Sequence, residues 1–168
     1  MAKSEKKKNK GTTETGEKIV SENRRARHDY HILDSLECGL VLVGSEVKSL
    51  RTCRVSIADS YAKVKNGELW LIGCDIPEYL EANRFNHKPK RDRKLLVHKR
   101  EIQKFANRAF EKGLTLIPLK LYFKNGRAKL LIGLGKGKQD FDKRESKKEA
   151  DVKKGLRQSM MKRLNNYW

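Results

Sequence analysis

Two stretches of alternating residues, each interrupted by Asn-Gly, constrain the fold of this chain more than any other feature. Apolar and polar residues alternate from Tyr61 to Lys65, Asn66-Gly67 follows, and the apolar run Leu69-Trp70-Leu71-Ile72 comes after it. The pattern recurs between positions 117 and 134 around Asn125-Gly126. A period of two places every second side chain on one face of a strand, and both residues of an Asn-Gly turn tolerate positive φ. The sequence therefore predicts two antiparallel β-hairpins.

Helical spacing is confined to short segments. The clearest predicted helix lies between the hairpins, and Gly113 is its expected terminator. Its apolar stripe is Ile102, Phe105, Ala106, Ala109 and Phe110. A shorter helix is predicted from Glu46 to Arg51, and a strand from Tyr30 to Leu36. The expected fold class is mainly β, an OB-like closed antiparallel β-barrel with about three short helices.

Composition divides the chain into three parts. Residues 1–18 are polar and rich in lysine, so we expect a disordered basic extension. Residues 19–137 are the expected barrel domain. Residues 138–168 are the expected basic tail, disordered in the free protein, with sparse apolar residues every four positions from Val152 to Leu164. Such a tail is marginal as an isolated helix but can fold along a polyanionic groove.

The net charge indicates the partner. Forty Lys and Arg oppose 21 Asp and Glu, which gives a formal charge of +19. Self-repulsion on this scale favours a polyanionic partner, with nucleic acid first and an anionic membrane second. The chain has no run of about 20 apolar residues and no secretory leader, so a membrane is not expected. Three cysteines without a CxxC pair predict neither zinc nor disulfides, and a cytoplasmic location follows.

Catalytic motifs are weak. The glycines and lysines of residues 133–138 lack the spacing of a nucleotide-binding loop, so neither a cofactor nor a metal is expected. His28 and His31 could act as acid and base in a ribonuclease, which remains an alternative to a non-enzymatic role.

Basic clusters carry the stronger signal. They occupy residues 23–28, 88–94 and 136–138, and Tyr30 and Phe85 could stack on bases nearby. RNA is favoured over duplex DNA because the chain lacks helix-turn-helix, zinc-finger and zipper patterns. A structural ribosomal protein is a further alternative, since a basic tail would suit it equally well.

An ordered set of short strings resembles the SmpB (small protein B) family, the tmRNA-binding proteins of bacterial trans-translation. The strings are Asn-Arg-Arg-Ala-Arg-His-Asp-Tyr (23–30), Glu-Cys-Gly-Leu (37–40), Gly-Ser-Glu-Val-Lys-Ser-Leu-Arg (44–51), Asp-Ser-Tyr (59–61), Arg-Lys-Leu-Leu (93–96), Gly-Lys-Gly-Lys (135–138) and Asp-Lys-Arg (142–144). The resemblance covers about residues 20 to 150.

The resemblance implies a non-enzymatic adaptor with an OB-like barrel. Such an adaptor binds the tRNA-like domain of tmRNA and promotes its delivery to stalled ribosomes. Alanyl-tRNA synthetase and elongation factor Tu are implied as indirect partners through tmRNA. On the ribosome the barrel would replace the missing anticodon arm in the decoding centre, and the tail would enter the empty mRNA channel as a helix. We expect the protein to be a monomer and not to associate with membranes.

The resemblance also implies site residues. Glu37, Leu96 and His98 match family positions involved in tmRNA binding. The other expected tmRNA contacts are Asn23, Arg24, Arg25, Arg27, His28, Tyr30, Lys48, Arg51, Arg93, Lys94, Lys136 and Lys138. The expected ribosomal contacts are Gly137, Phe141, Asp142, Lys143 and Arg144. The family often has His or Tyr where this chain has Phe141, which keeps stacking on a base but loses the ring's hydrogen bond.

Overall fold

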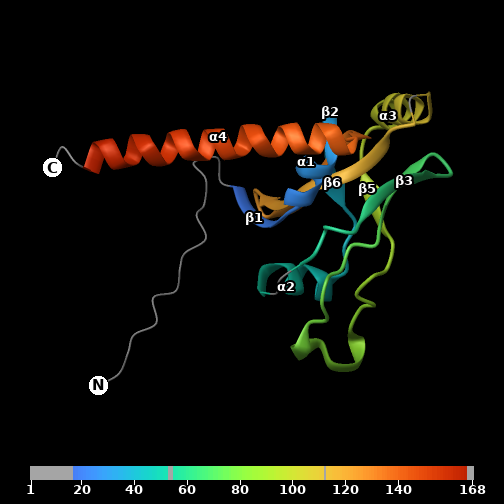
Figure 1. Ribbon diagram of the computed structural model, residues 1–168. Coiled ribbons are helices and arrows are strands. Elements are labelled where there is room, and N and C mark those ends of the chain that lie inside the picture. The colour runs from blue at the N-terminus through green and yellow to red at the C-terminus, as the bar shows by residue number, and fades with distance from the viewer. Residues whose placement is uncertain (1–16, 53–54, 112, 166–168) are drawn as a thin grey trace, which may run out of the picture.

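The computed structural model describes residues 17–52, 55–111 and 113–165, which form an antiparallel sheet with helices around it (Figure 1). The strands are β1 (Glu17–Glu22), β2 (Tyr30–Leu40), β3 (Tyr61–Lys65), β4 (Glu68–Ile72), β5 (Arg93–Leu96), β6 (Thr115–Lys124) and β7 (Arg127–Gly137). The helices are α1 (Arg24–Asp29), α2 (Gly44–Thr52), the 3₁₀ helix η1 (Leu80–Phe85), α3 (Lys99–Glu111) and α4 (Asp140–Asn165). The expected disorder of residues 1–18 falls almost entirely outside the described residues.

Both predicted hairpins are confirmed. Strands β3 and β4 pair across Asn66 and Gly67, whose φ angles are 52° and 73°. Strands β6 and β7 pair across Asn125 and Gly126, at 50° and 74°. These left-handed conformations are the ones that Asn and Gly adopt with the least strain.

The strands form one seven-stranded antiparallel sheet in the order β1-β6-β3-β4-β5-β2-β7. Strand β6 also pairs with β7, so the succession of pairings from β6 through β3, β4, β5, β2 and β7 returns to β6. The link between β3 and β6 is narrow, a single pair between Ala62 and Leu116. The mainly β prediction is confirmed, while β1, α1 and β5 were not predicted as separate elements.

The main core lies inside this sheet. Leu71, Leu121, Leu130 and Leu134 are fully buried there. Ile102 and Phe105 of α3 pack against the same cluster, as their helical spacing predicts. Phe110 does not, because it lies in the last turn of α3 and its side chain is 92% exposed.

The two described cysteines are part of the core. Cys38 and Cys74 are fully buried and free. Burial raises the pKa of the Cys38 thiol to about 12 and that of Cys74 to about 11, so both stay protonated at neutral pH. Cys53 lies outside the described residues.

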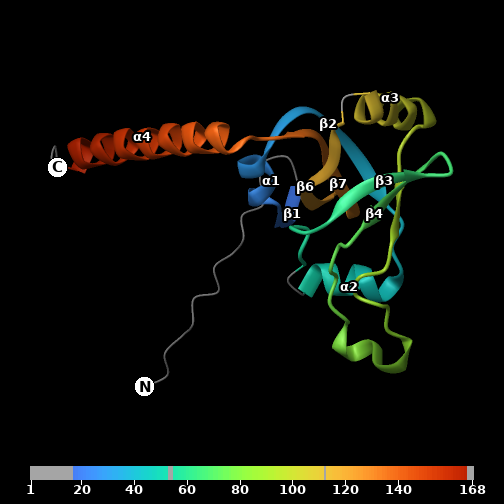
Figure 2. The ribbon, with the colours of Figure 1, turned by 45° about the vertical axis from the view of Figure 1, so that its right-hand side comes forward.

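The basic tail contains the longest helix of the described residues. Residues Asp140–Asn165 form one 26-residue helix, α4, which extends away from the sheet (Figures 1 and 2). Its lysines, arginines, glutamates and methionines are good helix formers. Val152, Leu156 and Met160 form the anticipated apolar stripe, yet each is more than half exposed. Among the described helices, none is long and apolar enough to cross a membrane.

Candidate nucleic-acid interface

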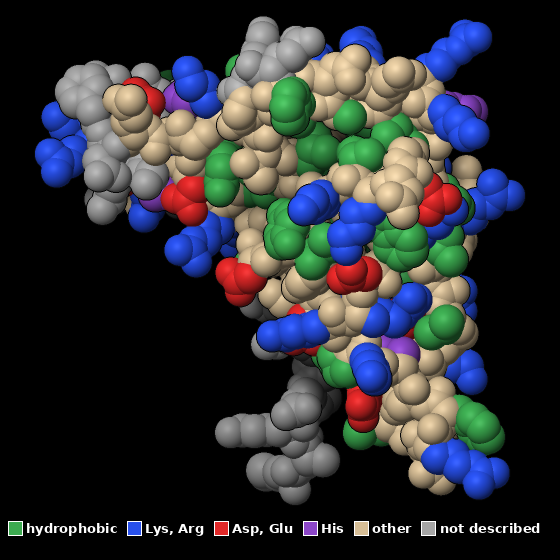
Figure 3. All heavy atoms as spheres, turned by 90° about the vertical axis from the view of Figure 1, so that its right-hand side faces the viewer, with side chains coloured by type: hydrophobic (Ala, Val, Ile, Leu, Met, Phe, Trp, Pro, Cys, Tyr) green, Lys and Arg blue, Asp and Glu red, His purple; other side chains and the backbone are tan. Residues whose placement is uncertain are grey.

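Basic side chains are spread over the surface of the sheet and its helices. Figure 3 shows Lys and Arg side chains distributed across the face that carries α3 and the β3–β4 hairpin, with acidic and hydrophobic side chains among them. Basic charge alone therefore does not mark a site on this face, and the candidate sites are the places where basic groups meet other functional groups.

One such place is α1, whose shape depends on Asn23. The Asn23 side chain accepts a hydrogen bond from the Ala26 amide at 3.0 Å and so caps the helix. Its amide nitrogen donates to the carbonyl oxygens of Ile57 and Ala58. Asn23 is 3% exposed, so it positions α1 and does not present its side chain to a partner.

The other residues of α1 form what we call the α1 surface together with the end of β7. Its members are Arg24, Arg25, Arg27, His28, Lys136 and Lys138. Arg25 is paired with Asp29 at 3.2 Å, and His28 Nδ1 lies 2.8 Å from the same carboxylate. The α1 surface therefore keeps one acidic group among several cations.

The start of α4 is attached to the α1 surface. The Lys138 amide donates to the Asp29 carbonyl at 2.8 Å, and its ammonium group donates to the Arg27 carbonyl at 3.2 Å. His31 Nε2 lies 3.7 Å from the Asp142 carboxylate. Arg144 is exposed on α4, while the side chains of Phe141 and Lys143 lie outside the described residues. Lys138 and Asp142, in the second group of predicted residues, therefore lie next to α1 and the start of β2.

Tyr30 and Gly137 join these segments within the sheet, because they are register partners of β2 and β7. The Tyr30 ring lies against Gly135, where an added Cβ would be 3.3 Å from the ring and 2.8 Å from Ile117. A glycine at 135 therefore allows the ring to lie close to β7.

A second place, which we call the Glu37 cluster, lies on β2, β6 and β7. The Tyr122 hydroxyl donates a hydrogen bond to the Glu37 carboxylate. The ammonium groups of Lys129 and Lys124 lie 3.1 Å and 3.5 Å from it. The hydrogen bond from Tyr122 and the nearby lysines hold the pKa of Glu37 below its usual range, whereas burial, aided by the Glu37 contact, raises the pKa of Tyr122. The carboxylate is ionised and its side chain is 35% exposed.

Leu96 lies beside the Glu37 cluster, and His98 follows two residues later. Gly39, two residues beyond Glu37 on β2, is the register partner of Leu96, and a Cβ at Gly39 would lie 3.3 Å from that of Leu96. Leu96 is 54% exposed although it is apolar. His98 is exposed at the start of α3, where its amide donates to Glu101 at 3.3 Å. The structure thus places Leu96 on a strand paired with β2 near Glu37, and His98 two residues after Leu96 in the chain.

Arg93 has a different place from the one expected. It is fully buried, donates to the Glu46 carboxylate at 2.9 Å, and donates to the carbonyl oxygens of Cys74, Arg91 and Pro89. Arg91 donates to the same carboxylate through two nitrogens. This buried network ties the segment before β5 to α2, so Arg93 positions the surface and cannot contact RNA as the protein stands.

The remaining predicted contacts have other side-chain partners. Lys94 is paired with Glu68. Lys48 and Arg51 are exposed on α2, where their charged groups lie 5.6 Å and 5.9 Å from the ring centroids of Tyr79 and Phe123.

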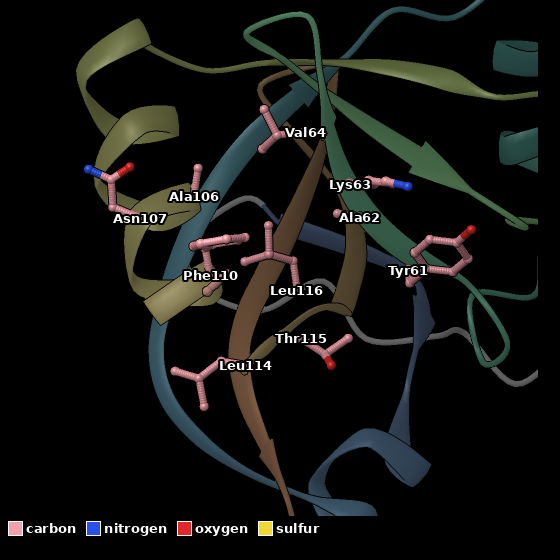
Figure 4. Close-up of a pocket in the computed structure, with 11 residues that line it drawn as sticks. Tyr61, Ala62, Lys63, Val64, Ala106, Asn107, Phe110, Leu114, Thr115 and Leu116 are labelled. Carbon is pink, nitrogen blue, oxygen red and sulfur yellow. The ribbon is translucent and has the colours of Figure 1, made fainter. Parts of the chain in front are cut away.

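An apolar hollow of about 610 Å³ separates α3 from β3 and contains none of the predicted residues. Figure 4 shows Phe110 from α3 and Tyr61 from β3 at its sides, with Leu116 of β6 between them. Among the described residues of its lining Lys63 is the one basic residue, so the chemistry of this hollow differs from that of the α1 surface.

The two histidines of the ribonuclease alternative have different partners. His28 lies against Asp29 and His31 lies near Asp142. Within the described ranges, no group of three or more His, Cys, Asp or Glu residues could hold a metal ion.

The chain is similar to known proteins in sequence and in fold. The family model described as SmpB protein matches residues 20–162. The chain belongs to the SmpB family. The SsrA-binding protein of Carboxydothermus hydrogenoformans is 53% identical over 147 residues, which are 88% of this chain and 99% of that protein. The SsrA-binding protein of Nitrobacter winogradskyi is 58% identical over 135 residues, which are 80% of this chain and 86% of that protein.

A solved structure shares the fold of this SmpB chain. It is described as "tmRNA-SmpB: a journey to the center of the bacterial ribosome" and is 47% identical, with a TM-score of 0.62. The match covers 76% of this chain and 93% of the other. The family resemblance drawn from the ordered strings is therefore confirmed.

Sequence reasoning missed the groups that surround Glu37. Tyr122, Lys124 and Lys129 lie on neighbouring strands and contact Glu37 only after β2, β7 and β6 pair. The alternation of Lys120, Tyr122 and Lys124 indicates a shared face. It does not indicate which strand that face adjoins.

Proposed function

We propose that this SmpB protein binds the tRNA-like domain of tmRNA and acts as a non-enzymatic adaptor of trans-translation in the cytoplasm. The carrying observation is the Glu37 cluster, an exposed ionised carboxylate held among lysines, with the exposed Leu96 on the neighbouring strand β5. The names of the curated relatives and of the similar ribosomal structure support the same function.

The chemistry of the Glu37 cluster suits a folded RNA. A carboxylate accepts hydrogen bonds from base amino groups and ribose hydroxyls, whereas Lys124 and Lys129 can neutralise phosphates. Leu96 offers an apolar surface to an unstacked base, and His98 offers a ring. We infer that Glu37, Leu96 and His98 contact tmRNA directly, whereas Asn23 and Arg93 act by positioning α1 and β5.

The α1 surface supports contact with RNA along the backbone. Arg24, Arg27, Lys136 and Lys138 supply donors to phosphates, and Arg can also stack on bases. Tyr30 and Glu37 are seven positions apart on β2, which corresponds to roughly 23 Å of strand. The two surfaces can therefore engage different parts of one RNA, or tmRNA and the ribosome separately.

The tail is proposed to act on the ribosome. Gly137, Phe141, Asp142, Lys143 and Arg144 would lie in the decoding centre in place of the missing codon–anticodon pair. A 26-residue helix is about 39 Å long, so α4 could extend into an empty mRNA channel and neutralise its RNA walls. Elongation factor Tu, which delivers tmRNA, and alanyl-tRNA synthetase, which charges it, would be indirect partners of the protein through tmRNA.

The return of the strand pairings to β6 supports an OB-like closed barrel as the scaffold for this binding. Closure through the single Ala62–Leu116 pair would leave the β3–β6 edge as its weakest seam.

The test compares tmRNA affinity of the wild type with that of Glu37→Ala and His98→Ala. Loss of a charge-assisted or stacking contact should weaken binding by about 1 to 3 kcal/mol for each variant. Asp92→Asn is a matched control, because Asp92 is exposed and paired with Lys65 at 3.1 Å. Unchanged affinity of both variants would remove the Glu37 cluster from the binding site. Cleavage of bound RNA that is lost in His28→Ala would instead favour a ribonuclease.

A further inference from the structure

The loop between β4 and β5 forms the tip of the molecule on the far side from α4 (Figures 1 and 2). It exposes two large apolar side chains, Leu80 at 93% and Phe85 at 77%. Neither belongs to the α1 surface or to the Glu37 cluster. Exposed aromatic side chains on a basic protein are candidates for contact with a partner.

The loop is held in place although its tip is exposed. The Asn86 side chain accepts from the Tyr79 amide at 3.0 Å and donates to the Tyr79 carbonyl at 2.7 Å, which closes the base of the loop. His87 is 6% exposed, with one ring nitrogen 3.0 Å from the Ser45 hydroxyl and the other 3.0 Å from the Ile76 carbonyl. Phe85 directly precedes these anchors, so its ring is presented on a constrained segment.

Phe85 borders a hollow of about 400 Å³ between the loop and the start of α2. This volume falls within the range of small-ligand sites. The polar groups around it already have partners, since Asn86 bonds to Tyr79, His87 to Ser45, and Arg91 to Glu46. A ligand in this hollow could therefore stack on the Phe85 ring. Few polar groups would be free to recognise the hydrogen-bonding pattern of a particular base.

The charge around Phe85 favours an anionic partner. The Arg84 guanidinium lies 5.0 Å from the Phe85 ring centroid, and Lys88 and Lys90 are exposed a few residues on. A stacked aromatic–guanidinium pair flanked by lysines suits a base and its phosphate, and stacking is tolerant of base identity.

We propose that Phe85, with Arg84, is a stacking site for one unpaired RNA base, which binds without strong preference for its identity. The inference rests on the proposed function, because the RNA in question is the one that the Glu37 cluster binds. Phe85 would be a third RNA contact, besides the α1 surface and the Glu37 cluster, at the tip of the molecule remote from α4.

The experiment measures tmRNA affinity for full-length Phe85→Ala, Phe85→Trp and the wild type. Phe85→Ala should weaken binding about tenfold, within the range for one lost stacked base, and Phe85→Trp should restore it. The slope of affinity against salt should not change, because no phosphate contact is removed. The same loss should appear with uridine-rich and adenine-rich single-stranded RNA.

Phe110→Ala is the matched control, because Phe110 is also an exposed phenylalanine but lies at the end of α3. It should bind like the wild type. Affinity of Phe85→Ala within twofold of the wild type would overturn the stacking site, as would an equal loss in both variants. Normal RNA affinity with defective peptide tagging would assign Phe85 to a protein contact instead. If the wild type binds tmRNA no more tightly than other RNAs, the proposed function fails. The affinities of the wild type and Phe85→Ala for single-stranded RNA would then still show whether Phe85 is a stacking site.

Discussion

The Tyr122 hydroxyl donates a hydrogen bond to the Glu37 carboxylate across β7, which lies between their strands. Tyr122 is 4% exposed, so without Glu37 its hydroxyl would lose the hydrogen-bond acceptor that it has in the fold. Glu37 therefore has two roles, since it stabilises the sheet from one side and offers a carboxylate to a partner from the other. A variant at this position has to be tested for stability as well as for binding.

Replacement of Glu37 by Gln should make stability depend differently on pH. The folded protein holds the pKa of Glu37 below its ordinary 4.5, so the carboxylate stabilises the fold at neutral pH and loses this effect as the pH falls through the lowered pKa. Urea unfolding should show Glu37→Gln as less stable than the wild type at pH 7, with the difference shrinking below pH 4.5. A difference that stays constant across this range would contradict the linkage.

The buried pair of Glu46 and Arg93 should be far more sensitive than a surface pair. Both side chains are fully buried, so Glu46→Gln leaves a buried guanidinium without its counter-charge and should destabilise by about 3 to 5 kcal/mol. Lys65→Ala breaks an exposed pair in which the Lys65 Nζ lies 3.1 Å from the Asp92 carboxylate. This substitution should change the free energy of unfolding by less than about 1 kcal/mol. Denaturant unfolding of the two variants measures both values, and similar losses would mean that the buried network does not anchor α2.

Gly135 and Gly137 should respond differently to alanine although they are two residues apart. A Cβ at Gly135 would lie 2.8 Å from Ile117 and 3.2 Å from Tyr30, whereas a Cβ at Gly137 meets nothing within 4 Å. We expect Gly135→Ala to lower stability by about 1 to 3 kcal/mol, the usual effect of overpacking. Gly137→Ala should stay within about 0.5 kcal/mol of the wild type. Thermal unfolding tests the pair, and equal effects would show that Tyr30 does not rest on Gly135.

Truncation after Lys138 should separate tmRNA binding from action on the ribosome. It removes α4 but keeps Lys138, whose bonds to Asp29 and Arg27 support the α1 surface. The Glu37 cluster lies in the sheet, so tmRNA affinity should remain within about threefold, a change below 1 kcal/mol, whereas peptide tagging should be lost. A collapse of affinity would place essential tmRNA contacts on α4.

The salt dependence of tmRNA affinity provides a further measurement. Counterion release predicts that the logarithm of affinity falls linearly with the logarithm of salt concentration. Arg27→Ala removes one cation of the α1 surface and should reduce the slope by about 1 if that side chain contacts a phosphate. An unchanged slope would place Arg27 away from the RNA backbone.

Much of the fold was predictable because its signals are local. Asn66-Gly67 and Asn125-Gly126 mark turns through the conformations that these residues tolerate, and the alternation on either side marks strands. The stripe from Ile102 to Ala109 similarly predicts α3. The four-residue β5 was missed because it lies within a basic segment and pairs with β2 and β4, which are distant in sequence.

The sequence by itself determined the hairpins, the central helix, the excess of positive charge and the family, because each depends on residue type and order. Only the tertiary structure decided which charges face solvent. Arg93 is buried against Glu46, whereas Arg24 and Arg27 are exposed. The sequence does not distinguish these basic segments, because the burial of Arg93 depends on the packing of α2 against β5. The Glu37 cluster likewise exists only once three strands are in register, because residues about 85 positions apart must meet to hold one carboxylate.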